Sequence, residues 1–190
     1  ILLCLMASNA CKPKTEENAT QTETPAKGND FKVDVRLSEL KWQAFKPLGG
    51  HEGIVPIREG NVIVENGAMT GGKIVLDMQN LQVTDLQGED KQNLEDHLRG
   101  NKPGKEDDFF NTSKYPTATF VVTKVTTLSG DPEATHMIEG NLTMRDIRKP
   151  VSFKAKVDLG AVDAIKITAP PFAIDRTEWG VKFRSKKFFD

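Results

Sequence analysis

Residues 151–157 read VSFKAKV and residues 164–169 read AIKITA, and these two stretches decide the fold class. In the first, apolar Val151 and Phe153 alternate with polar residues, and the second alternates in the same way. Successive side chains of a β-strand point to opposite faces, so each stretch predicts a strand with one apolar and one polar face. An antiparallel sheet of such strands must cover its apolar face. Closure into a barrel covers it and leaves an apolar interior, which favours holding a molecule over converting one.

The same alternation begins at Phe31 and recurs along the chain. It predicts further strands at 31–35, 40–44, 54–57, 62–64, 69–81, 118–125 and 136–145. We expect residues 54–57 and 62–64 to be two strands joined by a turn at Glu59–Gly60, and Glu65–Gly67 to form the next turn. One short amphipathic helix is predicted at 91–99, where Leu94 and Leu98 lie four residues apart.

Five longer motifs carry a family resemblance. In chain order they are GGHEGIVPIREG (49–60), GGKIVLDMQNLQVTDL (71–86), DDFFNTSKYPTATF (107–120), EGNLTMRDIRKPVSFKAKV (139–157) and FAIDRTEWGVKF (172–183). Together they resemble the YceI-like family of bacterial secreted proteins, over Phe31 to Asp190. The resemblance implies an all-β, antiparallel, up-and-down, lipocalin-like barrel of about eight strands, whose long apolar cavity holds isoprenoid-type lipids in some members.

The C-terminal residues depart from the family pattern. In the family, a segment like SKKFFD (185–190) is followed by one more strand, and this sequence stops there. We therefore expect the last strand to be missing and the seam of the barrel to be open.

The N-terminal part of the chain predicts export. Residues 1–11 are an apolar run, then small residues, then Cys11, which is typical of a signal ending in a lipobox whose cysteine becomes lipidated. The run has no initiator Met and no basic residue, so we expect it to be truncated at its start. An ordinary signal peptide cut after Ala10 is the alternative. Residues 12–29 lack large aliphatic side chains and predict a disordered tether, and residues 30–190 form the barrel domain.

This interpretation predicts a lipoprotein of the bacterial periplasm, attached to the membrane by a lipid anchor. Cys4 and Cys11 could also be taken as a disulfide or a metal pair. If export processing occurs, Cys4 leaves with the signal and Cys11 is modified, so the barrel contains no thiol, which suits an oxidising compartment.

Composition and motifs exclude several function classes. The 190 residues carry 26 Lys and Arg against 27 Asp and Glu, so the net charge of -1 gives no electrostatic case for nucleic acid. The sequence has no Gly-x-Ser-x-Gly motif and the barrel domain has no cysteine, so we expect no enzyme of the nucleophilic type. His51, His97 and His136 are far apart, so no metal or other cofactor is predicted, and His97 is expected at the surface.

The candidate ligand-binding residues lie on the apolar phases of the predicted strands. The cavity-lining candidates are Trp42, Ile74, Leu76, Met78, Phe120, Val122, Leu142, Met144, Phe153 and Phe172. Plain core packing is the alternative for all of them, because small barrels are often filled by their own side chains.

Four residues are candidates for the mouth of the cavity. His51 belongs to the GGHEG motif, and the adjacent Phe109 and Phe110 form either a plug on the barrel wall or a gate. Arg176 either meets an anionic headgroup or closes one barrel end by pairing with Asp175 or stacking on Trp179. We therefore expect a barrel that holds a long apolar lipid, isoprenoid or quinone-like, with a solid-core structural or stress-protective envelope protein as the alternative.

Overall fold

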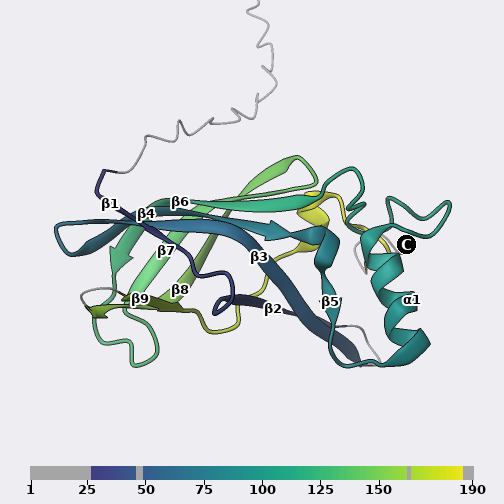
Figure 1. The fold of residues 1–190 in the computed structure, drawn as a ribbon, viewed down its shortest axis with the longest axis horizontal. Coiled ribbons are helices and arrows are strands. Elements are labelled where there is room, and N and C mark those ends of the chain that lie inside the picture. Colours follow the sequence, from purple (N-terminus) through teal and green to yellow (C-terminus); the bar gives the residue numbers. More distant parts are fainter. Residues whose placement is uncertain (1–26, 46–48, 162–163, 186–190) are drawn as a thin grey trace, which may run out of the picture.

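The computed structural model describes residues 27–45, 49–161 and 164–185 (Figure 1). Cys11 and the boundary between the signal and the tether lie outside the described residues. The strands are β1 (Asn29–Lys32), β2 (Glu39–Phe45), β3 (Gly50–Glu65), β4 (Ala68–Asp77), β5 (Gln82–Val83), β6 (Thr117–Thr127), β7 (His136–Met144), β8 (Ile147–Ala161) and β9 (Ala164–Thr168). The helical elements are α1 (Gly88–Arg99) and the 3₁₀ turns η1 (Met78–Asn80) and η2 (Arg176–Trp179).

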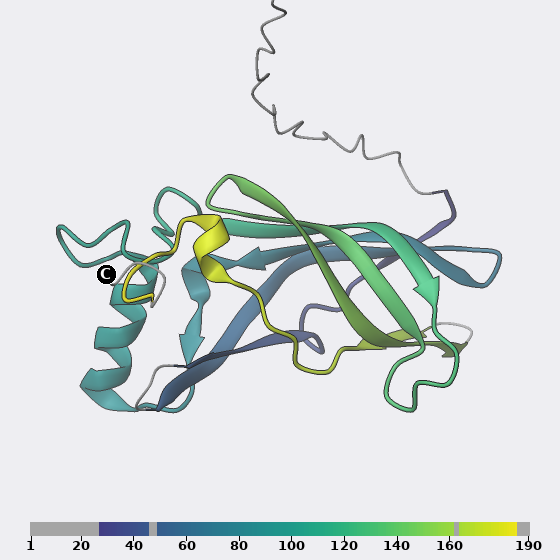
Figure 2. The same cartoon turned by 180° about the vertical axis from the view of Figure 1, so that it is seen from behind.

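The strands form one antiparallel sheet that curls into a nearly closed barrel (Figures 1 and 2). Its order is β1-β3-β4-β6-β7-β8-β9, and β2 and β5 each pair with β3. Each strand from β6 to β9 pairs with its neighbour in the chain, as expected for up-and-down connections joined by short turns. The predicted all-β barrel with a single helix is confirmed. Among the described residues, no ladder joins β9 to β1 or β2, and the seam lies there.

The predicted turn at Glu59–Gly60 is wrong, because β3 runs unbroken from Gly50 to Glu65. Ile57 lies opposite Leu76 whereas Glu59 lies opposite Val75, so Arg58 is one extra residue in a β-bulge. The Glu59–Gly60 pair, which resembled a turn, therefore lies inside the strand. Beyond the bulge, the even-numbered residues of β3 point to the face to which the odd-numbered residues point before it.

The turn after β3 has the backbone that its sequence predicts. Asn66 has a φ of 52° and Gly67 a φ of 75°. Positive φ at both central residues is typical of the two-residue hairpin turn that matches the twist of its strands. The next predicted strand, 69–81, ends earlier than expected, because the Asp77 carboxylate accepts hydrogen bonds from the backbone N–H groups of Gln79 and Asn80 and begins η1.

Helix α1 lies at one end of the barrel (Figures 1 and 2). It ends at Gly100, which takes the left-handed conformation favoured by glycine. Glu95 attaches the helix to β5: its side chain is 7% exposed and accepts hydrogen bonds from Val83 N (2.9 Å) and Lys91 Nζ (2.7 Å). Arg99 completes the cluster, with its Nη2 3.3 Å from Glu95 Oε2. A buried carboxylate is stable only when paired in this way.

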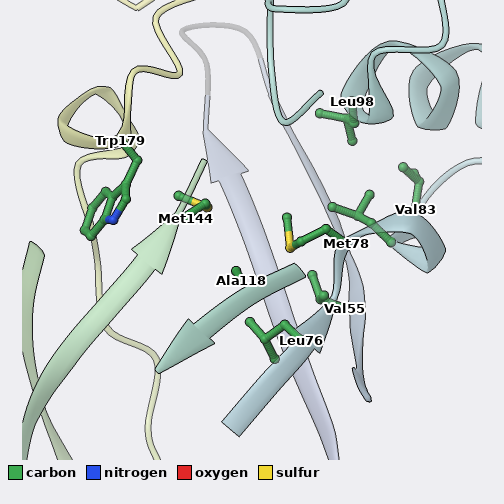
Figure 3. Packing of buried hydrophobic residues seen from close by; sticks show 9 residues of the cluster. Val55, Leu76, Met78, Val83, Leu98, Ala118, Met144 and Trp179 are labelled. Carbon is green, nitrogen blue, oxygen red and sulfur yellow. The ribbon is translucent and has the colours of Figure 1, made fainter. Parts of the chain in front are cut away.

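Two hydrophobic clusters fill different parts of the barrel. Figure 3 shows the first, near α1, which consists of Val55, Leu76, Met78, Leu81, Val83, Leu98, Ala118, Met144 and Trp179. The second consists of Val62, Met69, Ile138, Ala155 and Val157. Side chains packed against these clusters, among them Ile74, Phe120, Leu142 and Phe153, are only partly buried. The candidate site lies among those side chains.

Candidate functional site

One row of residues crosses five strands in the middle of the barrel. Gly60 lies opposite Ile74, Ile74 opposite Phe120, and Phe120 opposite Leu142. Leu142 in turn lies opposite Lys149 of β8. Directly opposed residues of an antiparallel pair point to the same face. Since Ile74 and Leu142 pack against the first cluster and Phe120 against the second, this face is the interior.

A glycine in the next row makes room for an aromatic ring. Gly140 lies opposite Val122 and Val151, beside the row that contains Phe120. A Cβ added at Gly140 would lie 2.4 Å from Phe120 Cζ, closer than any real side chain approaches. The missing side chain therefore allows the phenyl ring to lie across β7.

Three phenylalanine rings contact one another in series, from the inner face of β6 to the segment that follows β9. The rings of Phe120 and Phe153 have centroids 5.5 Å apart, and Phe153 stacks on Phe172 at 4.7 Å with an interplanar angle of 7°. Phe172 follows β9 and is 48% exposed, whereas Phe120 and Phe153 are partly buried. Stacked aromatic rings present a large apolar area with few rotatable bonds.

The ten predicted cavity-lining residues fall into two groups. Leu76, Met78 and Met144 are buried in the first cluster. The others retain accessible surface and are Trp42, Ile74, Phe120, Val122, Leu142, Phe153 and Phe172. Side chains of a close-packed core have little accessible surface, so the second group is less tightly packed than the first and keeps apolar surface that a ligand could cover.

A hydrogen bond to β5 fixes the side chain of Trp42. Its Nε1 donates to the carbonyl oxygen of Gln82 at 3.2 Å. The indole lies over Gly53, where a Cβ would be 2.7 Å from the ring. Glycine at this position of β3 is thus required for the ring to lie flat on the strand.

A hollow of about 240 Å³ opens beside β8, at the seam. It is lined by Pro150, Val151, Ser152, Ala173, Ile174, Asp175, Glu178 and Trp179. Val151 and Trp179 give it an apolar wall, and the two acidic residues make it polar. It is smaller than the roughly 300–1,000 Å³ usual for small-molecule sites, so it accounts for only part of a site for a long ligand.

Three of the four predicted mouth residues lie together at the α1 end. Phe109 and Phe110 pack against the first cluster. The Arg176 guanidinium lies 5.5 Å from the centre of the Phe109 ring and donates hydrogen bonds to the carbonyl oxygens of Val181 (3.1 Å) and Phe183 (2.7 Å). Burial lowers the pKa of Arg176. The ring beside Arg176 is therefore Phe109, whereas Trp179 was one of the partners considered from the sequence, and the charge of Asp175, another of them, also acts on Arg176.

Trp179 is placed by a different contact. Its indole Nε1 donates to the carbonyl oxygen of Leu142 at 3.0 Å, and the residue is 2% exposed. The hydrogen bond fixes η2 against β7 and satisfies the one polar atom of a buried ring.

His97 corrects another expectation, because it is not a surface residue. Its side chain is 17% exposed, and its Nε2 lies 2.7 Å from Asp108 Oδ2. The imidazole also meets Phe109 and Phe183 edge-on, at centroid distances of 5.0 and 4.9 Å. It is part of the packing between α1 and the following loop.

The fourth mouth candidate, His51, pairs with Asp85. Its Nδ1 lies 2.9 Å from Asp85 Oδ2, and Asp85 also accepts a hydrogen bond from Glu52 N at 3.1 Å. Burial raises the pKa of Asp85, but the hydrogen bonds from His51 and Glu52 outweigh it, so the net pKa is lowered. The pair joins the start of β3 to the segment that leads into α1.

Within the described ranges, no group of three or more His, Cys, Asp or Glu side chains is arranged to hold a metal ion. In the same part of the chain, no helix is both long and apolar enough to cross a lipid bilayer.

The sequence-based set of interior residues missed Lys149. The alternating phase of Val151 and Phe153 includes Lys149 when it is extended two residues toward the N-terminus. Pro150 interrupts the pattern there, because proline is rare inside strands. The ladder nevertheless continues through Pro150 to Ile147.

Comparisons with known proteins agree with this architecture. A family model described as a YceI-like domain matches residues 21–190. The crystal structure of BcnA from Burkholderia cenocepacia is 19% identical, with a TM-score of 0.52 over 66% of this chain and 71% of that chain. At this identity, the similarity shows a shared fold only.

Two crystal structures of mutant CJ YCEI proteins are also similar. The one with a monobromobimane guest is 17% identical, with a TM-score of 0.42 over 92% of this chain and 85% of that chain. The one for nanotechnology applications is 16% identical, with a TM-score of 0.37 over 80% of this chain and 69% of that chain. No curated protein sequence matches the chain at a significant level.

Proposed function

The chain belongs to the YceI-like family, and on that premise we propose that its barrel binds a long apolar lipid of the isoprenoid or quinone-like class. The family has a barrel fold and is known to bind hydrophobic ligands. The proposed role is binding without chemical conversion of the lipid.

The series of ring contacts from Phe120 through Phe153 to Phe172 is the observation that carries this proposal. These rings lie on or beside the inner face and keep accessible surface, so an apolar chain laid against them would bury more apolar area. Each buried methylene group contributes roughly 0.8 kcal/mol. A chain of several isoprene units therefore needs few polar contacts for tight binding.

The proposed location is the bacterial periplasm, with the protein attached to the membrane through Cys11. The support comes from the sequence of residues 1–11, which ends in small residues and a cysteine, and from the polar tether at 12–29. A flexible tether of 18 residues would keep the barrel within a few tens of ångströms of the lipid source.

A second candidate function is an envelope protein with a filled barrel and no ligand. The burial of Leu76, Met78, Met144 and Trp179 in the first cluster favours this alternative for the α1 end of the barrel. The partly exposed residues of the middle rows favour lipid binding over it.

A chain-length series tests the proposal. Geraniol, farnesol and geranylgeraniol would compete with a fluorescent prenyl probe for the purified protein. We expect the affinity to rise with each added isoprene unit, because each unit buries further methylene and methyl groups. Failure of all three alcohols to displace the probe, or an affinity independent of length, would contradict it.

A further inference from the structure

We propose that the lipid carries an anionic head, a phosphate or a carboxylate, and that Lys149 binds this head inside the barrel. The inference rests on the proposed function and names the chemical class of its ligand.

Lys149 lies on the inner face of β8. It is directly opposite Leu142, in the row that contains Phe120 and Ile74, and it shares the strand phase of Val151. Its neighbours in the chain, Arg148 and Pro150, point to the outer face and are exposed, whereas Lys149 is partly buried. A row that is otherwise glycine and apolar side chains thus ends in a lysine.

The ammonium group of Lys149 has no counter-ion in the described part of the chain. No hydrogen bond or ion pair of its side chain occurs there. The Asp175 carboxylate of the nearby hollow accepts hydrogen bonds from Thr177 N (3.0 Å) and Thr177 Oγ1 (2.6 Å). A partly buried lysine without a counter-ion can form charge-assisted hydrogen bonds with an anion that binds beside it.

The distances along β8 fit an amphiphile with its head at Lys149. Four residues of a strand separate Lys149 from Phe153, which is about 13 Å at the usual rise per residue. A tail that starts at the ammonium would pass Leu142 and Val151 before it meets the stacked rings of Phe153 and Phe172. The head would therefore face the α1 end, and the tail would extend toward the β8–β9 turn.

Binding of matched prenyl compounds tests the inference. Farnesol, farnesyl phosphate and farnesoic acid share one tail and differ in the head, and inorganic phosphate alone reports on the head without a tail. We expect the wild-type protein to bind one or both anionic compounds about tenfold or more tightly than farnesol, since charge-assisted hydrogen bonds are the strong ones. Whichever anion binds more tightly identifies the head, and inorganic phosphate should compete poorly.

Variants at Lys149, with one control at a second lysine, assign the preference to Lys149. Lys149→Met keeps the aliphatic stem and should reduce the preference to less than about threefold, because affinity for the anions falls much more than affinity for farnesol, and Lys149→Arg should retain the preference. Lys156→Met is the matched control, because Lys156 is exposed on the outer face of the same strand. Thermal melts of each variant, and Lys149→Gln as a second neutral variant, show whether the fold is intact.

The failures are distinguishable. If wild-type protein binds none of the three prenyl compounds, the proposed function itself is wrong. If it binds farnesol as tightly as the anions, or if Lys149→Met weakens farnesol and the anions equally, the lipid-binding function stands and the role of Lys149 is refuted.

Discussion

Substitution of Phe153 distinguishes a lipid-binding barrel from a filled one. The Phe153 ring is stacked on Phe172 and yet keeps accessible surface. Removing a ring that borders open space loses fewer packing contacts than removing one from a close-packed core. The same substitution removes apolar area that a bound lipid would cover.

We expect Phe153→Ala to lower the free energy of unfolding by less than the 3–5 kcal/mol that is typical of a buried aromatic residue. Lipid retention should fall at the same time. Thermal melts with and without a prenyl lipid measure both effects. Leu81→Ala is the control: Leu81 is 2% exposed and belongs to the first cluster, so its loss should cost about 2–5 kcal/mol without a specific binding defect.

The opposite order would remove Phe153 from the site. A melt of Phe153→Ala that collapses equally with and without lipid, with a loss of stability as large as that of Leu81→Ala, would show that the ring belongs to a solid core.

At the residue scale, the alternation of polar and apolar residues predicted which strand side chains point inward. It could not predict contacts between residues far apart in the sequence. Phe120, Leu142 and Phe153 are on the inner face as their alternation indicates. The partner of Arg176 is Phe109, 67 positions away in the sequence, and nothing local to either residue specifies that contact. The alternation of Val151 and Phe153 also places Lys149 on the inner face. Lys149 was not among the predicted interior residues, because Pro150 interrupts the strand pattern next to it.

At the scale of elements, the cluster around Glu95 determines how α1 is attached to the barrel. Burial raises the pKa of Glu95, but the hydrogen bonds from Lys91 and Val83 and the charges of Arg99 and Lys91 outweigh it, so the net pKa lies below its ordinary value of 4.5. A lowered pKa in the folded state means that the carboxylate contributes stability above pH 4.5, and that this contribution is lost as the pH falls through the folded-state pKa.

We therefore expect Glu95→Gln to be less stable than the wild type at pH 7, by about 1–3 kcal/mol, because charge-assisted hydrogen bonds are lost. The difference should shrink as the pH falls below 4.5, where the wild type loses the same interactions. Urea unfolding at a series of pH values measures it.

Glu89→Gln is the matched control, since Glu89 is exposed on the first turn of α1 and should contribute at most about 1 kcal/mol. A Glu95→Gln deficit that is constant with pH would contradict the assigned role of the carboxylate.

The elements themselves were largely predictable from local pattern. The helix predicted at 91–99 is α1 (Gly88–Arg99), and the turn predicted at Glu65–Gly67 joins β3 to β4. The bulge at Arg58 could not be predicted from the local sequence. Glu59–Gly60 has the composition of a turn, and only the pairing of β3 with β4 keeps the strand continuous. Turn propensity is a local signal, and a long sheet ladder overrides it.

At the scale of the whole molecule, the proposed location depends on residues 1–29. A cysteine that follows a run of apolar and small residues predicts lipidation, and a single acyl chain gives only marginal membrane binding, so several chains are needed for a stable anchor.

We expect Cys11→Ser to move the exported protein from the membrane fraction to the soluble periplasmic fraction. Fractionation followed by immunoblotting measures the distribution. Cys4→Ser is the control, because the proposed processing would remove the segment that contains Cys4, and this variant should stay with the membrane. Unchanged membrane association of Cys11→Ser would show that another segment or a partner holds the protein there.

The central claim is that the nearly closed barrel takes up one lipid molecule along its inner face. The residues from Ile74 to Lys149 lie in one row of the inner face, and Phe120 of this row contacts Phe153, which stacks on Phe172. We therefore expect a single long chain to lie against them.

Native mass spectrometry of the whole protein, purified from a bacterial envelope without added lipid, tests this claim most directly. We predict a species heavier than the protein with its covalent anchor by the mass of one bound lipid, which is lost in Phe153→Ala and retained in Leu81→Ala. A spectrum that contains only the unliganded mass, both before and after incubation with a prenyl lipid, would contradict the claim.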